Sequence, residues 1–193
     1  MIDSIMLGMT VAFWALFLGR TVMLMKQGVR VFVLAKGKKL AEKAVEVLFV
    51  PMFVLWTGQI LLTTLHMDWL ALPYLWTSIA VQWVGMVLCA LGLLIFLLAL
   101  ISFGSAWRVG IDESKSDKLV TDGIFAYSRN PIFLFMNMYF VGVFLVYPTV
   151  LFLLFFVGFA IGVHRQILNE ERFLRGKFGG AYEEYCKKTR RYL

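Results

Sequence analysis

Long stretches without a charged residue constrain this chain more than any other feature. The longest, Trp69–Trp107, covers 39 residues, and a second, Asn130–Val163, covers 34. Val47–Leu65 also lacks a charge, and Ile5–Met25 carries only Arg20. A helix needs roughly 20 apolar residues to cross the hydrocarbon core of a bilayer. Because a soluble domain of this length cannot bury a composition that is 61% hydrophobic, we expect an all-α, polytopic integral membrane protein.

The basic residues predict how the chain is oriented in the membrane. Of 19 lysines and arginines, six lie in Lys26–Lys43, four in Arg108–Arg129 and eight in Arg165–Arg191, whereas His66–Pro73 has none. Cytoplasmic loops carry such residues in excess. We therefore expect these basic segments and the C-terminus on the cytoplasmic side, with His66–Pro73 and the N-terminus outside. The net charge of +7 follows from this bias. It indicates membrane lipids as partners and no nucleic acid.

The uncharged run Asn130–Val163 is expected to fold as two helices. As one helix it would be about 51 Å long, against a hydrocarbon core of about 30 Å. Pro148 lies near its middle and breaks a helix. We predict a C-terminal hairpin of two short helices, Pro131–Val146 and Thr149–Val163. With a third span at Ile79–Ile101, the prediction is five transmembrane helices.

Composition divides the chain into a scaffold and a candidate catalytic region. Residues 1–101 hold three predicted spans and the basic cytoplasmic loop 26–43. Residues 102–193 hold a polar loop (102–130), the hairpin (131–163) and C-terminal cytoplasmic helices (164–193). A polar interruption as long as residues 102–130 is typical of a functional segment. The two cysteines form no Cys-x-x-Cys pattern, so no metal site is expected.

The first candidate block precedes the hairpin. Arg129-Asn130-Pro131 places a proline at a first helical position, and the free amides of that first turn point at whatever occupies the helix end. Gly123 permits close approach of a ligand, and Phe125, Tyr127 and Phe133 can form the walls around an adenine. In the alternative interpretation this is a capped membrane helix with Arg129 as an interfacial anchor.

The second block, Glu170-Glu171, lies just beyond the last predicted span. A carboxylate there could bind the ammonium or ribose hydroxyls of a cofactor. In the alternative interpretation the two residues form a solvated helix face, with Glu171 paired to Arg175. His164 and Arg165 lie about one turn deeper and could contact an anionic substrate group. We expect His164–Lys177 to continue as a helix that leaves the membrane and ends at Gly179-Gly180. A last short helix should follow at Ala181–Lys188.

The order and spacing of these blocks resemble the C-terminal signature of the isoprenylcysteine carboxyl methyltransferase and phospholipid methyltransferase family of integral membrane enzymes, in its prokaryotic type. The resemblance covers roughly Ser102–Leu193. Its segments are Leu119–Thr121 with Gly123 and Phe125, Arg129–Phe133, Glu170-Glu171 with Leu174, and Phe178-Gly179 with Tyr182 and Tyr185.

The chain departs from the family pattern at four positions. Asn130 replaces the usual His, and Phe125 and Phe133 replace Tyr. Gln166 stands where the protein-prenylcysteine enzymes carry a substrate-binding Arg. The methyl-donor site is therefore a firmer expectation than the acceptor.

The resemblance implies an S-adenosylmethionine-dependent methyltransferase that releases S-adenosylhomocysteine. Its acceptor would be lipidic, an isoprenylcysteine-type carboxylate on a small molecule or on a protein C-terminus. Glu170 and Arg129 are implied as catalytic residues, and Arg165, Gln166 and Glu170 as substrate contacts. The residues implied to bind the cofactor are Asp117, Lys118, Leu119, Val120, Gly123, Phe125, Asn130, Pro131, Ile132 and Phe133.

Other functions stay open at this point. A carboxylate acceptor needs positioning and the exclusion of water. A phospholipid amine acceptor needs in addition a base, for which Glu170 or Glu171 is a candidate. An NADPH-dependent membrane reductase of the sterol type is a further alternative, although 193 residues are short for it. A non-enzymatic membrane scaffold or small transporter predicts charged groups in mid-span, and Arg20 is the one such residue, near a helix end.

Overall fold

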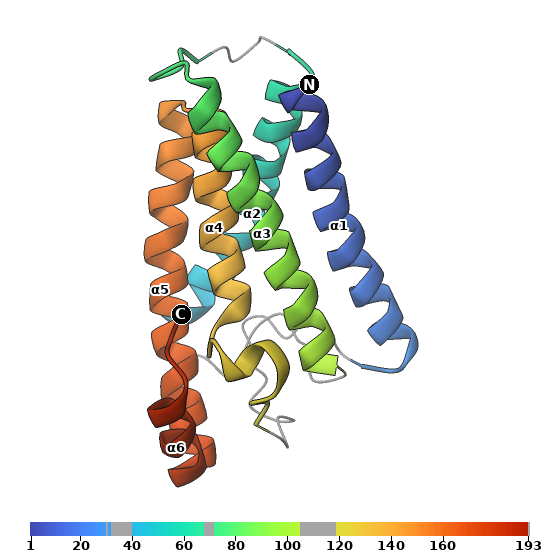
Figure 1. The fold of residues 1–193 in the computed structure, drawn as a ribbon. Helices are drawn as coiled ribbons and strands as arrows, with labels where there is room; N and C mark the ends of the chain where they lie inside the picture. The colour runs from blue at the N-terminus through green and yellow to red at the C-terminus, as the bar shows by residue number, and fades with distance from the viewer. Residues whose placement is uncertain (30, 32–39, 68–71, 105–118, 193) are drawn as a thin grey trace.

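The computed structural model describes residues 1–29, 31, 40–67, 72–104 and 119–192, with the side chains of 40–50 left out. Residues 30 and 32–39 of the basic loop 26–43 fall outside this part, as do Asp117 and Lys118. In the part described, the regular elements are all helices (Figure 1). They are α1 (Ile2–Lys26), α2 (Leu40–Thr64), α3 (Ile79–Phe103), the 3-10 helix η3 (Gly123–Ala126), α4 (Pro131–Val146), α5 (Val150–Phe178) and α6 (Gly180–Lys188).

The all-α architecture and the membrane-spanning character are confirmed at the level of helix length and composition. Within the described residues, three helices, α1, α3 and α5, are long and apolar enough to cross a membrane, and α4 is a shorter apolar helix. The helix α2 begins at Leu40, earlier than the predicted run, because the Ala, Glu and Lys residues that precede the run are strong helix formers. The count of five spans and the cytoplasmic orientation stay predictions.

The turn between α4 and α5 forms where the sequence predicts it. Helix α4 begins at Pro131 and ends at Val146. The Thr149 side chain caps α5 by accepting a hydrogen bond from the Phe152 amide at 3.3 Å. Helix α5 then continues without a break to Phe178, about 44 Å by its 29 residues. In Figure 1 its lower part, with α6 beside it, extends beyond the ends of α1 and α3.

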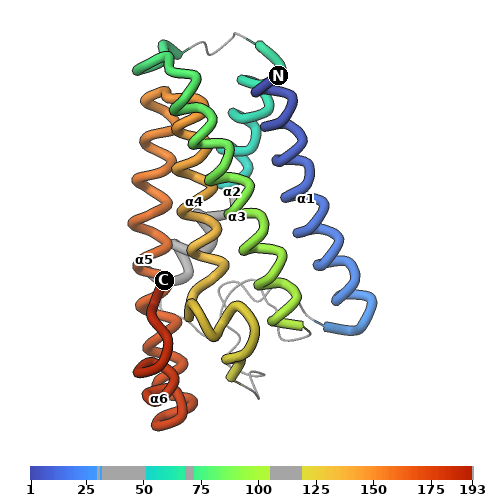
Figure 2. Tube along the Cα trace, viewed as in Figure 1, coloured from blue at the N-terminus to red at the C-terminus, as the bar shows by residue number. Residues whose placement is uncertain are grey.

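Close packing of α3 on α4 fixes the two ends of the connection between them, the loop 104–130. The two helices lie side by side in Figure 2 and form the most extensive interhelical contact of the described part. They approach at Gly85 and Gly142, where a Cβ atom added to Gly85 would lie 2.6 Å from the Gly142 carbonyl oxygen. Such small-residue contacts allow helix backbones to meet in membranes.

Aromatic rings fill the centre of the bundle and join α1, α2, α3, α4 and α5. Phe13 of α1 contacts Phe53 of α2 and Phe135 of α4, with ring centroids 5.4 and 5.5 Å apart. Phe135 also stacks on Phe96 of α3 at 4.6 Å. Phe140 of α4 stacks on Phe159 of α5 at 3.9 Å. Because the centre is apolar, the buried polar side chains described below lie at the two ends of the bundle.

Candidate functional site

A buried carboxylate shared by two arginines organises the end of the bundle where α3 ends and α4 begins. The Arg129 Nη2 atom lies 2.8 Å from Glu171 Oε1. The Arg191 guanidinium binds the same carboxylate with two bonds, Nε to Oε1 at 3.0 Å and Nη2 to Oε2 at 2.8 Å. Glu171 is 4% exposed and Arg129 10% exposed, so both lie away from bulk water. These three residues are called the Glu171 cluster below.

The arginines keep the Glu171 carboxyl ionised. Burial alone raises the pKa of this carboxyl, but hydrogen bonds from Arg191 and Arg129 and their charges outweigh it, so the pKa lies below its usual value. Both oxygens of the carboxylate accept charge-assisted hydrogen bonds. A carboxylate held in this way is a weak base, and its role is to hold the two guanidinium groups.

The C-terminal segment 180–192, called the tail below, packs on the loop 119–130, called the motif loop. After α6 the chain runs back beside α5 to its own C-terminus (Figure 1). The backbone amide of Arg129 donates to the Arg190 carbonyl at 3.0 Å. The Arg129 Nη1 atom donates to the carbonyls of Thr189 at 2.8 Å and Cys186 at 3.2 Å. One arginine therefore joins the motif loop, α5 and the tail.

Two further side chains close the contact between tail and motif loop. The Tyr185 hydroxyl donates to the Phe125 carbonyl at 2.6 Å. Burial raises the pKa of this phenol to about 12, so it keeps its proton at neutral pH. The Thr189 hydroxyl donates to the Ala126 carbonyl at 3.3 Å. Much of the hydrogen bonding of the motif loop is thus supplied by residues far along the chain, as it must be when an irregular segment is buried.

Two of the residues predicted to bind the cofactor, Asn130 and Pro131, directly follow Arg129 of the Glu171 cluster. Asn130 is 7% exposed and donates through Nδ2 to the Arg191 carbonyl at 3.1 Å. Pro131 is buried at the first position of α4, where a proline was expected. Four further members of the predicted set are half-buried: Leu119, Val120, Ile132 and Phe133.

The structure gives Gly123 and Phe125 packing partners on α3. Gly123 has a φ of +61°, and an added Cβ atom would collide with the Ser102 hydroxyl. That hydroxyl accepts a hydrogen bond from the Ile124 amide at 3.3 Å. The Phe125 ring is buried against Phe103 with centroids 4.5 Å apart. Both residues fix the motif loop on α3, and their predicted roles toward a ligand stay predictions.

The residues implied to contact substrate lie on α5. Arg165 is exposed, whereas Gln166 and Glu170 are half-buried and share a helix face by their spacing of four. The carboxylate that contacts Arg129 is that of the neighbouring residue, Glu171. Sequence reasoning treated Glu171 as a second choice and counted Arg191 among the basic residues of the tail without giving it a place in the site.

The suggested pairing of Glu171 with Arg175 on a solvated helix face is wrong. Glu171 faces inward toward the motif loop, and Arg175 pairs with the exposed Glu183 of α6 instead. The reason is geometric: α6 folds back beside the end of α5 and brings a carboxylate to Arg175, while the tail brings Arg191 to Glu171. Neither contact has a local sequence signal, because each depends on the turn at Gly179.

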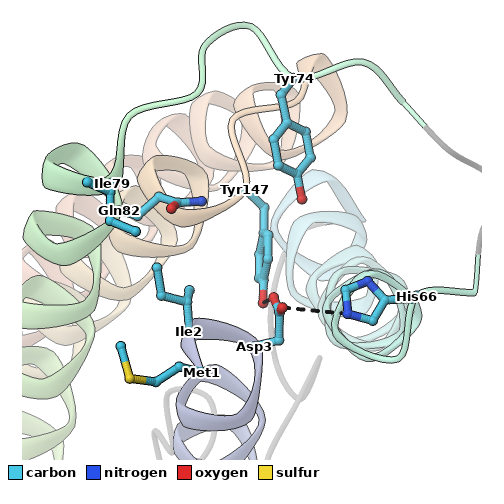
Figure 3. Close-up of a pocket in the computed structure, with 8 residues that line it drawn as sticks. All are labelled: Met1, Ile2, Asp3, His66, Tyr74, Ile79, Gln82 and Tyr147. Atoms are coloured by element: carbon cyan, nitrogen blue, oxygen red, sulfur yellow. Dashed lines mark hydrogen bonds and ion pairs between the residues drawn. The ribbon is translucent and has the colours of Figure 1, made fainter.

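A second polar cluster lies at the opposite end of the bundle (Figure 3). The Tyr147 hydroxyl, from the turn between α4 and α5, donates to Asp3 Oδ1 at 2.8 Å. Asp3 Oδ2 lies 3.6 Å from Nε2 of His66, which follows α2. Tyr74 and Gln82 complete the polar lining of a cavity of about 370 Å³. Every polar contact here joins one helix end to another, and the cluster ties α1 to α2 and to the α4–α5 turn.

Replacing Tyr147 by phenylalanine tests this tie. Tyr147 is 2% exposed, so the change removes one hydrogen bond and leaves the ring packing intact. Because water can reach Asp3 and replace the lost donor, we expect a loss of about 1 kcal/mol in the free energy of unfolding. Thermal unfolding in detergent measures it, with Tyr74→Phe as the matched control on the more exposed ring. Equal melting temperatures for the two variants would contradict the structural role of the Tyr147–Asp3 bond.

Comparison with known families assigns the chain to a protein family. A family model described as phospholipid methyltransferase matches residues 80–181, more than half of the sequence. A search of curated proteins found no match to the chain. The helices and the match together define a membrane methyltransferase. The chain belongs to the phospholipid methyltransferase family, and the matched residues include the motif loop and Glu171 but not most of the tail.

Proposed function

We propose that the protein transfers a methyl group from S-adenosylmethionine to a lipidic acceptor that carries a carboxylate, of the isoprenylcysteine type. Support comes first from the family match over residues 80–181. It comes also from the order of the motifs, which resembles the C-terminal signature of the isoprenylcysteine carboxyl methyltransferase and phospholipid methyltransferase family and continues beyond the C-terminal limit of the match. The family assignment favours methyl transfer over the sterol-type reductase and the non-enzymatic scaffold.

The proposed donor site lies on the motif loop and the start of α4. Pro131, Ile132 and Phe133 are the apolar residues of this region, and they follow directly on Arg129 of the Glu171 cluster, which carries excess positive charge, and on the polar Asn130. Such a combination suits an adenosine with an amino-acid carboxylate. When bound, S-adenosylmethionine supplies an electrophilic methyl group on a sulfonium. The residues of the chain would orient it and keep water away.

The observation that carries the carboxylate acceptor is the state of Glu171. Transfer to a carboxylate forms an oxygen–methyl bond, breaks the sulfur–methyl bond and leaves a neutral thioether, so no proton moves. Transfer to an amine also requires a base to take a proton. The buried carboxylate at this end of the bundle is held by two arginines with a lowered pKa, which makes it unsuited to that task. The two arginines also exceed the one carboxylate in charge, which favours an anionic acceptor group.

A phospholipid amine is the second candidate acceptor, and the description of the matching family favours it. In that case Glu170 is the residue of α5 that would take the proton. The phosphate of such a lipid would then interact with the excess positive charge of the Glu171 cluster. The two candidates therefore share the donor site and differ in the chemistry of the methylated atom.

The chemistry of the product distinguishes the two acceptors. Purified protein is incubated with tritium-labelled S-adenosylmethionine and either N-acetyl-S-farnesylcysteine or vesicles of phosphatidylethanolamine. We expect label in farnesylcysteine that alkali releases as volatile methanol, because a methyl ester is hydrolysed by base. Label in the lipid that resists alkali would instead establish the amine acceptor. Absence of transfer to either acceptor, together with no binding of S-adenosylhomocysteine in calorimetry, would overturn the proposed donor.

A further inference from the structure

The tail supplies one side of the Glu171 cluster, and it does so through Arg191. The two bonds from Arg191 to the two oxygens of Glu171 fix the plane of the carboxylate. Arg129 has a single bond, to Oε1. The orientation in which Glu171 meets Arg129 is therefore set by Arg191. No other basic side chain of the described residues is placed on this carboxylate.

The same tail residues position the segment that leads into α4. Arg129 donates its backbone amide to the Arg190 carbonyl, and Asn130 donates its side-chain amide to the Arg191 carbonyl. Between η3 and the start of α4, four residues have no helix of their own to hold them. When residues are held by hydrogen bonds to a distant segment, they change position if that segment moves. The start of α4 is thus held on one side by the tail.

We propose that Arg191 is a positioning residue for the methyl-donor site, acting through Glu171 and Arg129 and having no contact with the reacting atoms. This inference rests on the proposed function, because it takes residues 129–133 as part of the donor site. Most of the tail lies beyond the residues matched by the family model. The inference therefore comes from the contacts of this chain and gives the tail a role in donor affinity.

The test compares Arg191→Gln with Arg190→Gln. Both variants remove one positive charge at adjacent positions, but the Arg190 side chain is exposed, and Arg190 contributes only its carbonyl to Arg129. We expect Arg191→Gln to weaken S-adenosylhomocysteine binding about tenfold or more, the effect of losing charge-assisted hydrogen bonds at a partly buried site. Arg190→Gln should match the unmodified protein. Arg191→Lys should not restore affinity, since lysine lacks the planar fork.

Steady-state kinetics separate positioning from a general loosening of the structure. Positioning raises the donor KM of Arg191→Gln and leaves the acceptor KM within about twofold, whereas loosening of the bundle raises both. Equal donor affinities of the Arg191 and Arg190 variants would overturn the inference, as would parallel rises in both KM values. If the unmodified protein itself fails to bind S-adenosylhomocysteine, the proposed function fails instead, so the two failures are distinguishable.

A second variant covers the case in which Arg191→Gln does not fold. Tyr185→Phe removes the hydroxyl that donates to the Phe125 carbonyl and leaves every charge of the Glu171 cluster in place. If the tail positions the donor site, this variant should raise the donor KM about threefold to tenfold with little change in the acceptor KM. An unchanged donor KM in a folded Tyr185→Phe protein would overturn the inference by itself.

Discussion

Replacement of Glu171 by glutamine should cost the protein both its stability and its methyl transfer. The change leaves the Arg129 guanidinium, which is 10% exposed, without a carboxylate, and it places an amide donor against two arginines that have only donors. Removing one partner of a buried ion pair typically costs about 3–5 kcal/mol. Because Arg191 is 38% exposed and can regain water, we expect the lower half of that range. Thermal unfolding in detergent and transfer of labelled methyl groups measure the two losses.

Glu184→Gln is the matched control. It removes the same charge from an exposed residue of α6 that forms no hydrogen bond or ion pair with the other described residues, and it should leave both quantities near those of the unmodified protein. Similar melting temperatures for the Glu171 and Glu184 variants would mean that the Glu171 cluster does not hold the tail in solution. Glu170→Gln provides a further contrast. If Glu170 serves the acceptor, that variant should lose transfer without the fall in melting temperature of Glu171→Gln.

Acid should affect the unmodified protein and Glu171→Gln differently. The pKa of Glu171 is lowered in the folded protein, so folding is stabilised by this ionised carboxylate at any pH above its unfolded pKa of about 4.3. That contribution is lost as the pH falls through the lower, folded pKa. The difference in stability between the unmodified protein and Glu171→Gln should therefore be constant near neutral pH and shrink in strongly acid solution.

The helices of the second half were predictable because residues with strong backbone preferences mark their ends. Pro131 begins α4, the turn at Pro148 separates α4 from α5, and Gly179, with a φ of +50°, ends α5. Each signal is local, and it acts on the backbone of the residue that carries it. Counting apolar residues gave α4 its observed bounds, whereas for α5 it gave only the part up to Val163, because the helix continues through charged residues to Phe178.

The contacts of the candidate site were not predictable in the same way. Glu171 meets Arg129 across 42 positions of sequence and Arg191 across 20. No local sequence signal distinguishes Glu171 from Glu170. Arg191 could be explained by the excess of basic residues expected in cytoplasmic segments, so there was no reason in the sequence to look for its partner. Which glutamate faces inward depends on the rotation of α5 against α4, and therefore on the packing of Phe159 on Phe140 near the centre of the bundle.

Gly123 has a structural requirement that differs from its predicted role. Sequence reasoning assigned it to the approach of a ligand. The structure shows two requirements that need no ligand, a positive φ and close contact with Ser102 of α3. Both requirements anchor the motif loop to the end of α3, so the position of the predicted donor site depends on how α3 and α4 are packed.

Replacement of Gly142 by alanine should therefore damage the protein from a position remote from the motif loop. An added Cβ atom would lie 2.7 Å from the Gly85 carbonyl oxygen and 3.1 Å from the Cys89 amide nitrogen. Both are backbone atoms of α3 and cannot rotate away, so the two helices must separate. Overpacking of this kind costs about 1–3 kcal/mol, and with two backbone neighbours we expect the upper end. The measurement is thermal unfolding in detergent.

Gly158→Ala on α5 is the matched control, because its added methyl group meets nothing within 4 Å. It should be neutral or stabilising by about 0.5–1 kcal/mol, as alanine is favoured over glycine within a helix. Separation of α3 from α4 also moves Ser102 relative to Pro131, at the two ends of the loop 104–130. Gly142→Ala should then lose donor affinity even at temperatures where it stays folded. If Gly142→Ala and Gly158→Ala have the same melting temperature and the same affinity for S-adenosylhomocysteine, the close contact of α3 with α4 does not position the donor site.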